Sequence, residues 1–181
     1  MSFEKTSLDG VIIITPRVFE DERGWLMESY SQRTLAECGI NCTFVQENHI
    51  CSTQKGILRG IHFQNSPFAQ AKLVRCIKGA VMDFAIDLRK NSPTYKQHVC
   101  VELTEDNKKQ LFIPRGFGHA VISLTDYSEI VYHVDNLYSK EHDRTISCFD
   151  EQLNIKWPTT EIILSEKDKN ALTLEKSDCN F

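Results

Sequence analysis

Several features that define other classes of protein are absent from this 181-residue sequence. It has no C-x-x-C pair, and its seven cysteines are an odd number spread from Cys38 to Cys179, so neither a disulfide framework nor a structural zinc site is expected. No apolar run is long enough to cross a bilayer, and the first ten residues carry Glu4, Lys5 and Asp9 without an apolar signal segment. We therefore expect a cytoplasmic protein in reduced surroundings, neither secreted nor membrane-embedded.

An excess of positive charge is also missing. Lys and Arg number 21 against 25 Asp and Glu, and the formal net charge is -4, with both signs interspersed. A broad basic face for nucleic acid is therefore not expected, although a small phosphorylated ligand can still be bound locally. There is no Gly-rich phosphate loop, repeat, low-complexity segment or linker. The length suits a single domain, residues 1–181, that buries a substantial core.

The chain does contain many short β-branched and aromatic runs between turn signals, which predict a nearly all-β sandwich or barrel. Helical signals occur only at residues 33–38 and in a short turn starting at Ser165. In one predicted strand the polar residues Gln46 and Asn48 share a face, which indicates either a wet ligand cavity inside a barrel or a solvent-facing surface. The predicted strands are residues 11–15, 25–30, 43–51, 72–77, 80–88, 97–103, 110–113, 119–124 and 129–134.

The segment around His62 follows the spacing of the first cupin metal-binding signature, but its ligands have changed. Five residues separate Gly56 from His62, the second His position holds Gln64, and the Glu position holds Lys72. The second half of the signature, Pro-x-Gly-x-x-His, is intact and ends at His119. A charged ammonium cannot ligate a divalent cation, so we expect no metal and a cavity that stabilises an anion. A metal-dependent cupin oxygenase is the disfavoured alternative.

Longer motifs extend this pattern over most of the chain, from Asp21 to Asp168. They are Arg59 to Gln64, Lys72, Asp83 to Arg89, Ile113 to His119, Tyr132 and Ile155 to Pro158. With them the chain resembles the dTDP-4-dehydrorhamnose 3,5-epimerase family. The resemblance implies a homodimeric, cofactor-independent cupin jelly roll, a double-stranded β-helix with small helical additions. It also implies inversion of the carbons flanking the ketone of a nucleotide-diphosphate 4-keto-6-deoxy sugar, in deoxysugar or surface-polysaccharide biosynthesis.

Proton removal next to a ketone requires a base, a group that stabilises the enolate oxygen and an acid on the opposite face. The resemblance places His62 as the base, Tyr132 as the acid and Lys72 at the developing oxyanion. We expect a nearby cation to draw down the pKa of the phenol. The resemblance also pairs Asp168 with His62, whereas the residues alone favour reading Ser165-x-x-Asp168 as a capping box.

The resemblance also carries over a set of substrate-binding positions. Arginines suit a pyrophosphate because a planar guanidinium binds two phosphate oxygens at once. Asp83, Asp87 and Arg89 are interpreted as a structural ion-pair group outside the site. The expected substrate-binding residues are Arg23, Glu28, Gln46, Asn48, Arg59, His119, Asp143 and Lys167.

Some positions depart from the family pattern. Leu26 and Leu137 stand where many relatives carry aromatic residues that sandwich the base, which makes a GDP sugar an alternative to a dTDP sugar. Ala120 replaces the usual glycine, and we expect its methyl group next to the site. The alternative functions are a single-position epimerase acting at C3 or C5 of a GDP-linked hexose or heptose, a cupin 3,4-ketoisomerase and a non-catalytic sugar-binding cupin. The joint presence of His62, Lys72 and Tyr132 speaks against the non-catalytic cupin, and Tyr132 supports inversion at both carbons.

Overall fold

The structure is a computed structural model that describes residues 1–181. Its strands are β1 (Ser2–Lys5), β2 (Ile12–Thr15), β3 (Val18–Asp21), β4 (Gly24–Met27), β5 (Gln46–Ser52), β6 (Leu58–Gln64), β7 (Lys72–Lys78), β8 (Ala80–Asp87), β9 (His98–Thr104), β10 (Gln110–Ile113), β11 (Phe117–Ser123), β12 (Ser128–Val134) and β13 (Asp143–Thr145). The helices are α1 (Gln32–Glu37) and α2 (Glu166–Lys169), with two 3₁₀ turns at Glu151–Leu153 and Leu174–Lys176.

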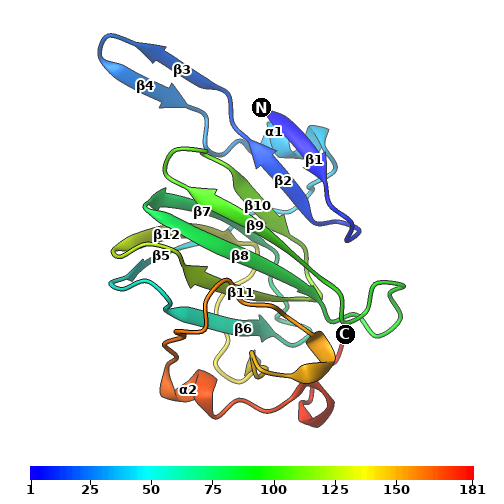
Figure 1. The fold of residues 1–181 in the computed structure, drawn as a ribbon. Coiled ribbons are helices and arrows are strands. Elements are labelled where there is room, and N and C mark those ends of the chain that lie inside the picture. The colour runs from blue at the N-terminus through cyan, green and yellow to red at the C-terminus, as the bar shows by residue number, and fades with distance from the viewer.

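The strands form two antiparallel sheets that face each other (Figure 1). The six-stranded sheet has the order β1-β2-β10-β7-β12-β5, and the five-stranded sheet has the order β13-β6-β11-β8-β9. From β5 to β8 and again from β9 to β13 the chain changes sheet at every connection, so strands far apart in sequence become neighbours. This double-sheet architecture is the jelly roll that the sequence predicts.

Side chains alternate between the two faces of each strand, which divides the apolar residues into separate clusters. Val74 from the six-stranded sheet and Ala85 from the five-stranded sheet belong to the cluster between the sheets. Phe84 and Ile122 point to the outer face of the five-stranded sheet, where the C-terminal segment covers them with residues such as Leu174. The C-terminal segment is therefore a structural part of the domain, and it reaches the edge of the cavity described below.

Every predicted strand overlaps an observed strand, and the predicted helix at 33–38 corresponds to α1, whose N-cap is Ser31. Ser165 is the N-cap of α2, as the sequence indicates. The strands absent from the prediction are β1, β3 and β13, which are short and contain few buried residues, and β6, which Gly60 interrupts. No helix is long and apolar enough to span a membrane.

Gly60 allows β6 and β11 to approach closely. Its φ is +139°, and a Cβ at this position would lie 2.5 Å from the Cβ of Ala120. Ala120 is fully buried in the outer cluster, on the face of β11 that points away from the cavity between the sheets. The expectation that its methyl group lies next to the site is therefore wrong, because that methyl packs against Gly60. The close approach accompanies a register in which His62 lies opposite His119.

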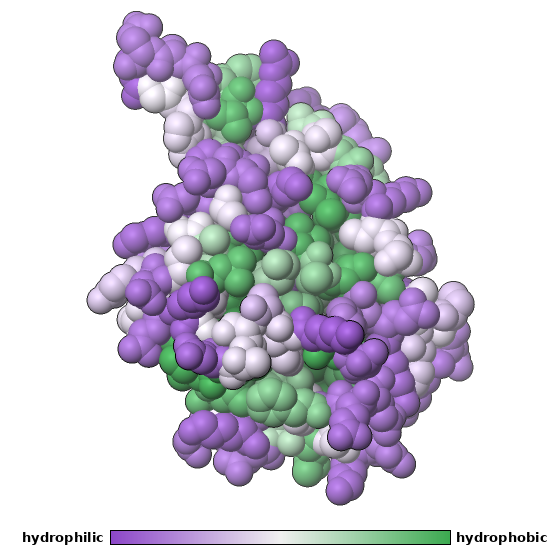
Figure 2. Space-filling view, in the orientation of Figure 1, coloured by the Kyte–Doolittle hydropathy of each residue, from purple (hydrophilic) through white to green (hydrophobic).

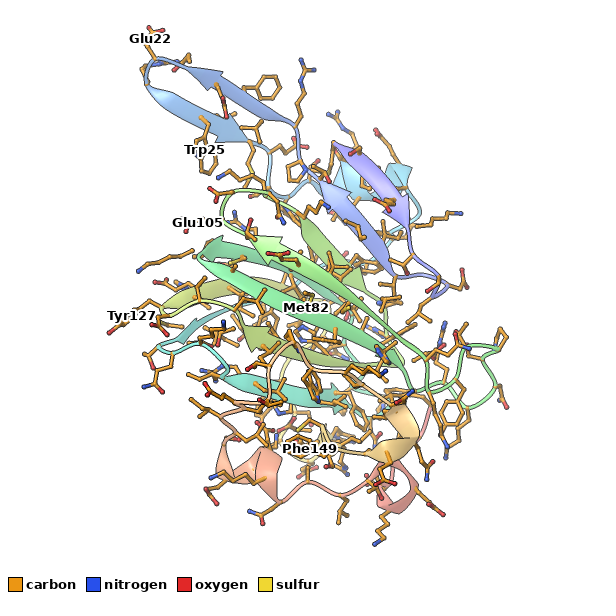
Figure 3. All side chains as sticks on the ribbon, in the orientation of Figure 1. Glu22, Trp25, Met82, Glu105, Tyr127 and Phe149 are labelled. Carbon is orange, nitrogen blue, oxygen red and sulfur yellow. The ribbon has the colours of Figure 1, made fainter.

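The β3–β4 hairpin projects away from the two sheets (Figure 1). Three of its large apolar side chains are exposed: Phe19 (51%), Trp25 (54%) and Leu26 (68%). The tip is hydrophilic, with apolar side chains nearer the body of the protein (Figure 2), and Trp25 points back toward that body, away from Glu22 at the tip (Figure 3). Within the chain, Lys108 Nζ lies over the Trp25 ring at 3.9 Å from its centre, while a two-stranded ribbon with exposed apolar side chains is only marginally stable on its own.

Candidate active site

Polar side chains from both sheets replace the apolar core in one part of the space between them. His62 and His119 lie opposite each other in the β6–β11 pair, so their side chains share a face. Asp83 reaches the same face from β8, where it hydrogen bonds to His119. Lys72 and Tyr132 enter from the opposite sheet. The space between the sheets thus holds imidazoles on the side of the five-stranded sheet, and an ammonium and a phenol on the side of the six-stranded sheet.

The β5–β12 pair adds further polar groups to the wall that carries Tyr132. Tyr132 lies opposite Asn48, and Gln46 is two residues away on the same face. The Gln46 amide Nε2 donates to Asn48 Oδ1 over 2.9 Å, which confirms the predicted common face of these two residues. On β6, the Arg59 guanidinium donates to the backbone oxygen of Cys51 over 3.1 Å, so it too is held at the cavity rim.

His62 and Asp168 form a short hydrogen-bonded pair, with 2.6 Å between His62 Nε2 and Asp168 Oδ1. Ser165 Oγ accepts from the Asp168 backbone N–H over 3.1 Å and donates to Asp168 Oδ2 over 2.8 Å. Asp168 therefore contacts His62, as the resemblance implies, and Ser165 caps α2, but the reciprocal bond of a capping box, from the Ser165 N–H to the Asp168 carboxylate, is not formed. Since Nε2 is occupied by the carboxylate, Nδ1 is the ring nitrogen left for other chemistry. A cavity of about 410 Å³ is lined by Arg59 together with these residues.

The charge of Asp168 is stabilised although the residue is only 4% exposed. Burial pushes the pKa of its carboxyl group upward, but the hydrogen bond from His62, the His62 charge and the Ser165 hydroxyl outweigh burial and leave the pKa below its usual value. An ionised carboxylate fixes the imidazole tautomer and stabilises the imidazolium form. When Nε2–H of His62 donates to this carboxylate, the lone pair of the neutral ring lies on Nδ1.

A second group of buried side chains is linked by hydrogen bonds in the order Lys72, His119, Asp83. His119 Nε2 lies 3.0 Å from Asp83 Oδ2, and His119 Nδ1 lies 3.3 Å from Lys72 Nζ. A carboxylate accepts the Nε2 proton, so Nδ1 carries the lone pair that faces the ammonium. Burial lowers the pKa of His119 most, Asp83 opposes this, and the net effect is a lowered pKa that keeps the imidazole neutral.

Asp83 is a site residue that the sequence interpretation missed. Asp87 and Arg89 do form the expected ion pair, with 2.8 Å between Arg89 Nη2 and Asp87 Oδ2, but placing Asp83 in that pair was wrong. Asp83 is fully buried between inward-facing apolar positions of β8, such as Ala85. A carboxylate at an inward position of an apolar strand requires a buried partner, and this was the available signal.

Lys72 carries a titratable charge rather than the fixed one that the motif suggested. Its side chain is buried, and burial lowers its pKa from 10.5 to about 8, against the opposing influence of Asp83 and Asp143 and with the help of Lys167. The ammonium is therefore mostly protonated at neutral pH and becomes neutral in mildly alkaline solution. It is a poorly solvated cation, which favours interaction with a developing anion.

The expectation that a cation lowers the pKa of Tyr132 is wrong. Burial raises its pKa more than Arg59 lowers it, and Asp143 adds to the increase. Lys72 Nζ lies 5.7 Å from the centre of the Tyr132 ring and over its face. The phenol thus stays protonated well above neutral pH, and its proton remains available for donation.

The remaining predicted residues divide into two groups. Asp143 and Lys167 pair at the cavity edge with 2.6 Å between Oδ2 and Nζ, close enough to influence the pKa of Lys72. Arg23 and Glu28 are not brought to the cavity within one chain. Arg23 lies on the projecting hairpin with an 82% exposed side chain, and Glu28 follows the hairpin and accepts a hydrogen bond from Thr34.

Gln64, which stands at a former ligand position, ties two loops to β6 and does not contact the reacting groups. Its amide Nε2 donates to the backbone oxygens of Phe68 and Leu137 over 2.7 and 3.1 Å, and its Oε1 accepts from the Ser139 N–H over 2.6 Å. All polar atoms of this buried amide are thereby satisfied. The Gln64 side chain therefore binds backbone groups of the two loops, at the position where the cupin signature has a metal-binding histidine.

The model of the dTDP-4-dehydrorhamnose 3,5-epimerase family matches residues 5–176. The chain belongs to that family. It is 47% identical over 179 residues to dTDP-4-dehydrorhamnose 3,5-epimerase of Shigella flexneri, a match that covers 98% of each protein. The family reaction is an isomerase-type epimerisation of a sugar nucleotide, so the expected enzyme class is confirmed.

Two solved structures of this epimerase family are similar to the chain over nearly its whole length. The Bacillus anthracis enzyme with TDP and PPi bound is 40% identical, with a TM-score of 0.93 and coverage of 95% of this chain and 98% of that one. The Legionella pneumophila enzyme in complex with dTDP-4-keto-L-rhamnose is 40% identical, with a TM-score of 0.94 and coverage of 98% and 94%. The all-β jelly-roll prediction is thereby confirmed.

Proposed function

We propose that this epimerase inverts C3 and C5 of a dTDP-linked 4-keto-6-deoxyhexose, with the residues of the described cavity as its catalytic groups. The observation that carries the proposal is the facing arrangement of the His62–Asp168 pair on one wall and Lys72 with Tyr132 on the other. Family membership supports the sugar nucleotide as substrate. The nucleotide is proposed as dTDP because the similar solved structures hold TDP and a dTDP sugar.

The first step is removal of a proton from a carbon next to the C4 ketone. His62 Nδ1 takes this proton, the C–H electron pair forms a C=C bond to C4, and the π pair of the C4 carbonyl moves onto its oxygen to give the enolate. The imidazolium that results is stabilised by Asp168 through the 2.6 Å contact at Nε2. This arrangement lets a neutral imidazole act as base while its conjugate acid remains held in place.

The enolate oxygen gains its charge next to Lys72. A buried ammonium whose lone hydrogen-bond partner among the side chains is His119 Nδ1 has donors left for that oxygen. In a low-dielectric cavity such a cation stabilises a developing anion far more than it does in water. Asp83 supports the arrangement because it accepts the His119 Nε2 proton and leaves Nδ1 facing Lys72.

Reprotonation from the opposite face completes the inversion. Tyr132 comes from the sheet opposite His62, and its raised pKa keeps the phenol protonated until the carbanion forms. Donation by Tyr132 after abstraction by His62 inverts the carbon, whereas return of the proton from His62 restores the starting configuration. Arg59, Asp143 and the amides Gln46 and Asn48 are proposed to hold the nucleotide and sugar.

Solvent exchange tests the reaction. With dTDP-4-keto-6-deoxyglucose in deuterium oxide, we expect deuterium at both C3 and C5 by NMR, because each abstracted proton is replaced from solvent. The GDP-linked sugar, expected to exchange slowly, is the matched comparison. Exchange at one carbon would identify a single-position epimerase. A product with its ketone at C3 would identify a 3,4-ketoisomerase. The absence of exchange with both sugars would favour a non-catalytic sugar-binding protein.

We also propose that the protein is a homodimer in which the hairpin of one chain reaches the cavity of the other. Arg23 and Glu28 are expected to bind substrate but lie outside the cavity of their own chain. The hairpin that carries Arg23 exposes Phe19, Trp25 and Leu26, a surface suited to a protein contact. A second copy related by a two-fold axis would satisfy both observations, since each hairpin would then serve the other subunit.

Mixed dimers test this arrangement. Co-expression of His62→Gln and Arg23→Ala chains with different tags should yield hybrids with about half the wild-type activity, because one of the two sites then contains neither substitution. Hybrids of His62→Gln with Lys72→Met provide the control. Both residues lie in one chain's cavity, so each site of that hybrid keeps one defect. Inactive His62→Gln/Arg23→Ala hybrids would show that Arg23 acts in its own subunit, and an Arg23→Ala homodimer with full activity would show that Arg23 has no role in the reaction.

A further inference from the structure

Ser165 makes two hydrogen bonds to Asp168 that differ in purpose. The Ser165 Oγ accepts the backbone N–H of Asp168, which is the ordinary bond of a helix N-cap. The same Oγ donates its own proton to Asp168 Oδ2 over 2.8 Å, and capping does not require this second bond. Asp168 Oδ1, the other oxygen, is the one that contacts His62. Ser165, Asp168 and His62 therefore form an unbroken chain from the cap of α2 to the cavity.

The donated bond matters because Asp168 is nearly inaccessible to water. A buried carboxylate needs hydrogen bonds on both oxygens, and Ser165 is the side-chain donor on Oδ2 as His62 is on Oδ1. Without Ser165 one oxygen of the carboxylate is left without a side-chain donor. The carboxylate then becomes harder to ionise and is free to rotate away from the imidazole.

Three other charged or titratable groups lie near the His62–Asp168 pair, and they act on it without hydrogen bonding to Asp168. Lys167 lowers the pKa of Asp168, His119 lies opposite His62 on β11, and Asp168 raises the pKa of the buried Cys148 thiol. None of them hydrogen bonds to Asp168 Oδ2. The second oxygen of the carboxylate is therefore controlled by Ser165.

We propose that Ser165 is a positioning residue of the epimerase, and that its hydroxyl holds the Asp168 carboxylate in line with His62. The inference rests on the proposed function of the pair as the proton-abstracting unit. The Ser165 hydroxyl then has two roles: it caps α2, and it keeps Asp168 aligned with His62. Ser165 touches no reacting atom and acts through Asp168.

Variants that separate capping from donation test the proposal. Ser165→Gly removes the hydroxyl but remains a tolerable N-cap, Ser165→Ala removes both functions, and Ser165→Thr keeps both. We expect Ser165→Gly and Ser165→Ala to lower kcat/KM about tenfold or more, because each deletes a hydrogen bond to a charged group, and Ser165→Thr to stay near wild type. The pKa of the Asp168 carboxyl group should rise in both hydroxyl-free variants, because its ionised form loses a hydrogen-bond donor, and the acid limb of the kcat/KM profile should change as a result.

Ser31 provides the matched control. It caps α1 with the same kind of bond, from Thr34 N to Ser31 Oγ, and is remote from His62. Ser31→Ala should lower thermal stability as capping predicts, without moving the pH profile. The proposal is overturned when Ser165→Gly keeps the wild-type rate and pH profile, or when Ser31→Ala moves that profile equally. An NMR titration of the Asp168 carboxyl group tests it without turnover: an unchanged Asp168 pKa in Ser165→Gly refutes the positioning role even where wild-type exchange fails.

Discussion

Replacement of His62 by Gln is expected to reduce deuterium incorporation at C3 and C5 by about 10³-fold, because the protein then lacks the base that starts both inversions. The glutamine amide can still donate to Asp168 Oδ1, so the contact between β6 and α2 and the fold should survive. Deuterium incorporation followed by NMR measures the rate, and thermal unfolding verifies the fold.

His98 is the matched control for this substitution. It lies on β9, its half-buried side chain packs near Phe84 on the outer face of the sheet, and burial lowers its pKa. His98→Gln should keep the wild-type exchange rate at both carbons. Exchange that persists at C3 but is lost at C5 in His62→Gln would contradict a single base for both positions and would require a second one.

Replacement of Lys72 by Met is expected to give the second large loss of activity, about 10²–10³-fold in kcat, because the enolate oxygen loses its cation. KM should change much less, since the ammonium acts mainly on charge that develops in the transition state. Steady-state kinetics with the dTDP sugar measures both. Lys78→Met on the same strand is the control, because Lys78 is exposed and pairs only with Glu129 at 3.4 Å.

The same Lys72→Met variant makes a thermodynamic prediction with a defined sign. Burial lowers the pKa of Lys72 from 10.5 to about 8 in the folded protein. Below pH 8 Lys72 is protonated in both the folded and the unfolded protein, so the full cost of burying its charge is present. Between pH 8 and 10.5 Lys72 stays protonated only in the unfolded protein, which therefore binds more protons. The Lys72 contribution to wild-type stability should therefore rise across that interval, by on the order of 3 kcal/mol. Denaturant unfolding at several pH values should show no such contribution in Lys72→Met; parallel curves for the two proteins would contradict the assignment.

The predictable part of the fold was its regular part. Strands such as β10 and β12 alternate or concentrate β-branched residues between turn signals, so their positions follow from side-chain burial alone. β6 was not delimited as a strand because Gly60, with its positive φ, breaks the pattern where the chain approaches β11. Ala120 was assigned to the wrong face for a different reason: it was placed next to the site because it follows His119, whereas alternation along β11 sends its methyl group to the opposite face.

The site residues that belong to a spaced sequence motif were predictable. Those whose role depends on tertiary contacts were not. His62, Lys72 and His119 occupy positions of a known signature, so their convergence in one cavity was expected. Asp83 has no motif of its own, and its contact with His119 arises from the pairing of β8 with β11. The raised pKa of Tyr132 depends on how deeply the phenol is buried, which no local pattern reports.

The hydrogen bond between His62 and Asp168 joins residues 106 positions apart in the chain. During synthesis the strand that bears His62 leaves the ribosome long before the turn that bears Asp168. A nascent barrel can thus assemble its sheets while its histidine still lacks its carboxylate partner. Translation itself therefore delays the completed pair until the turn that bears Asp168 has been made.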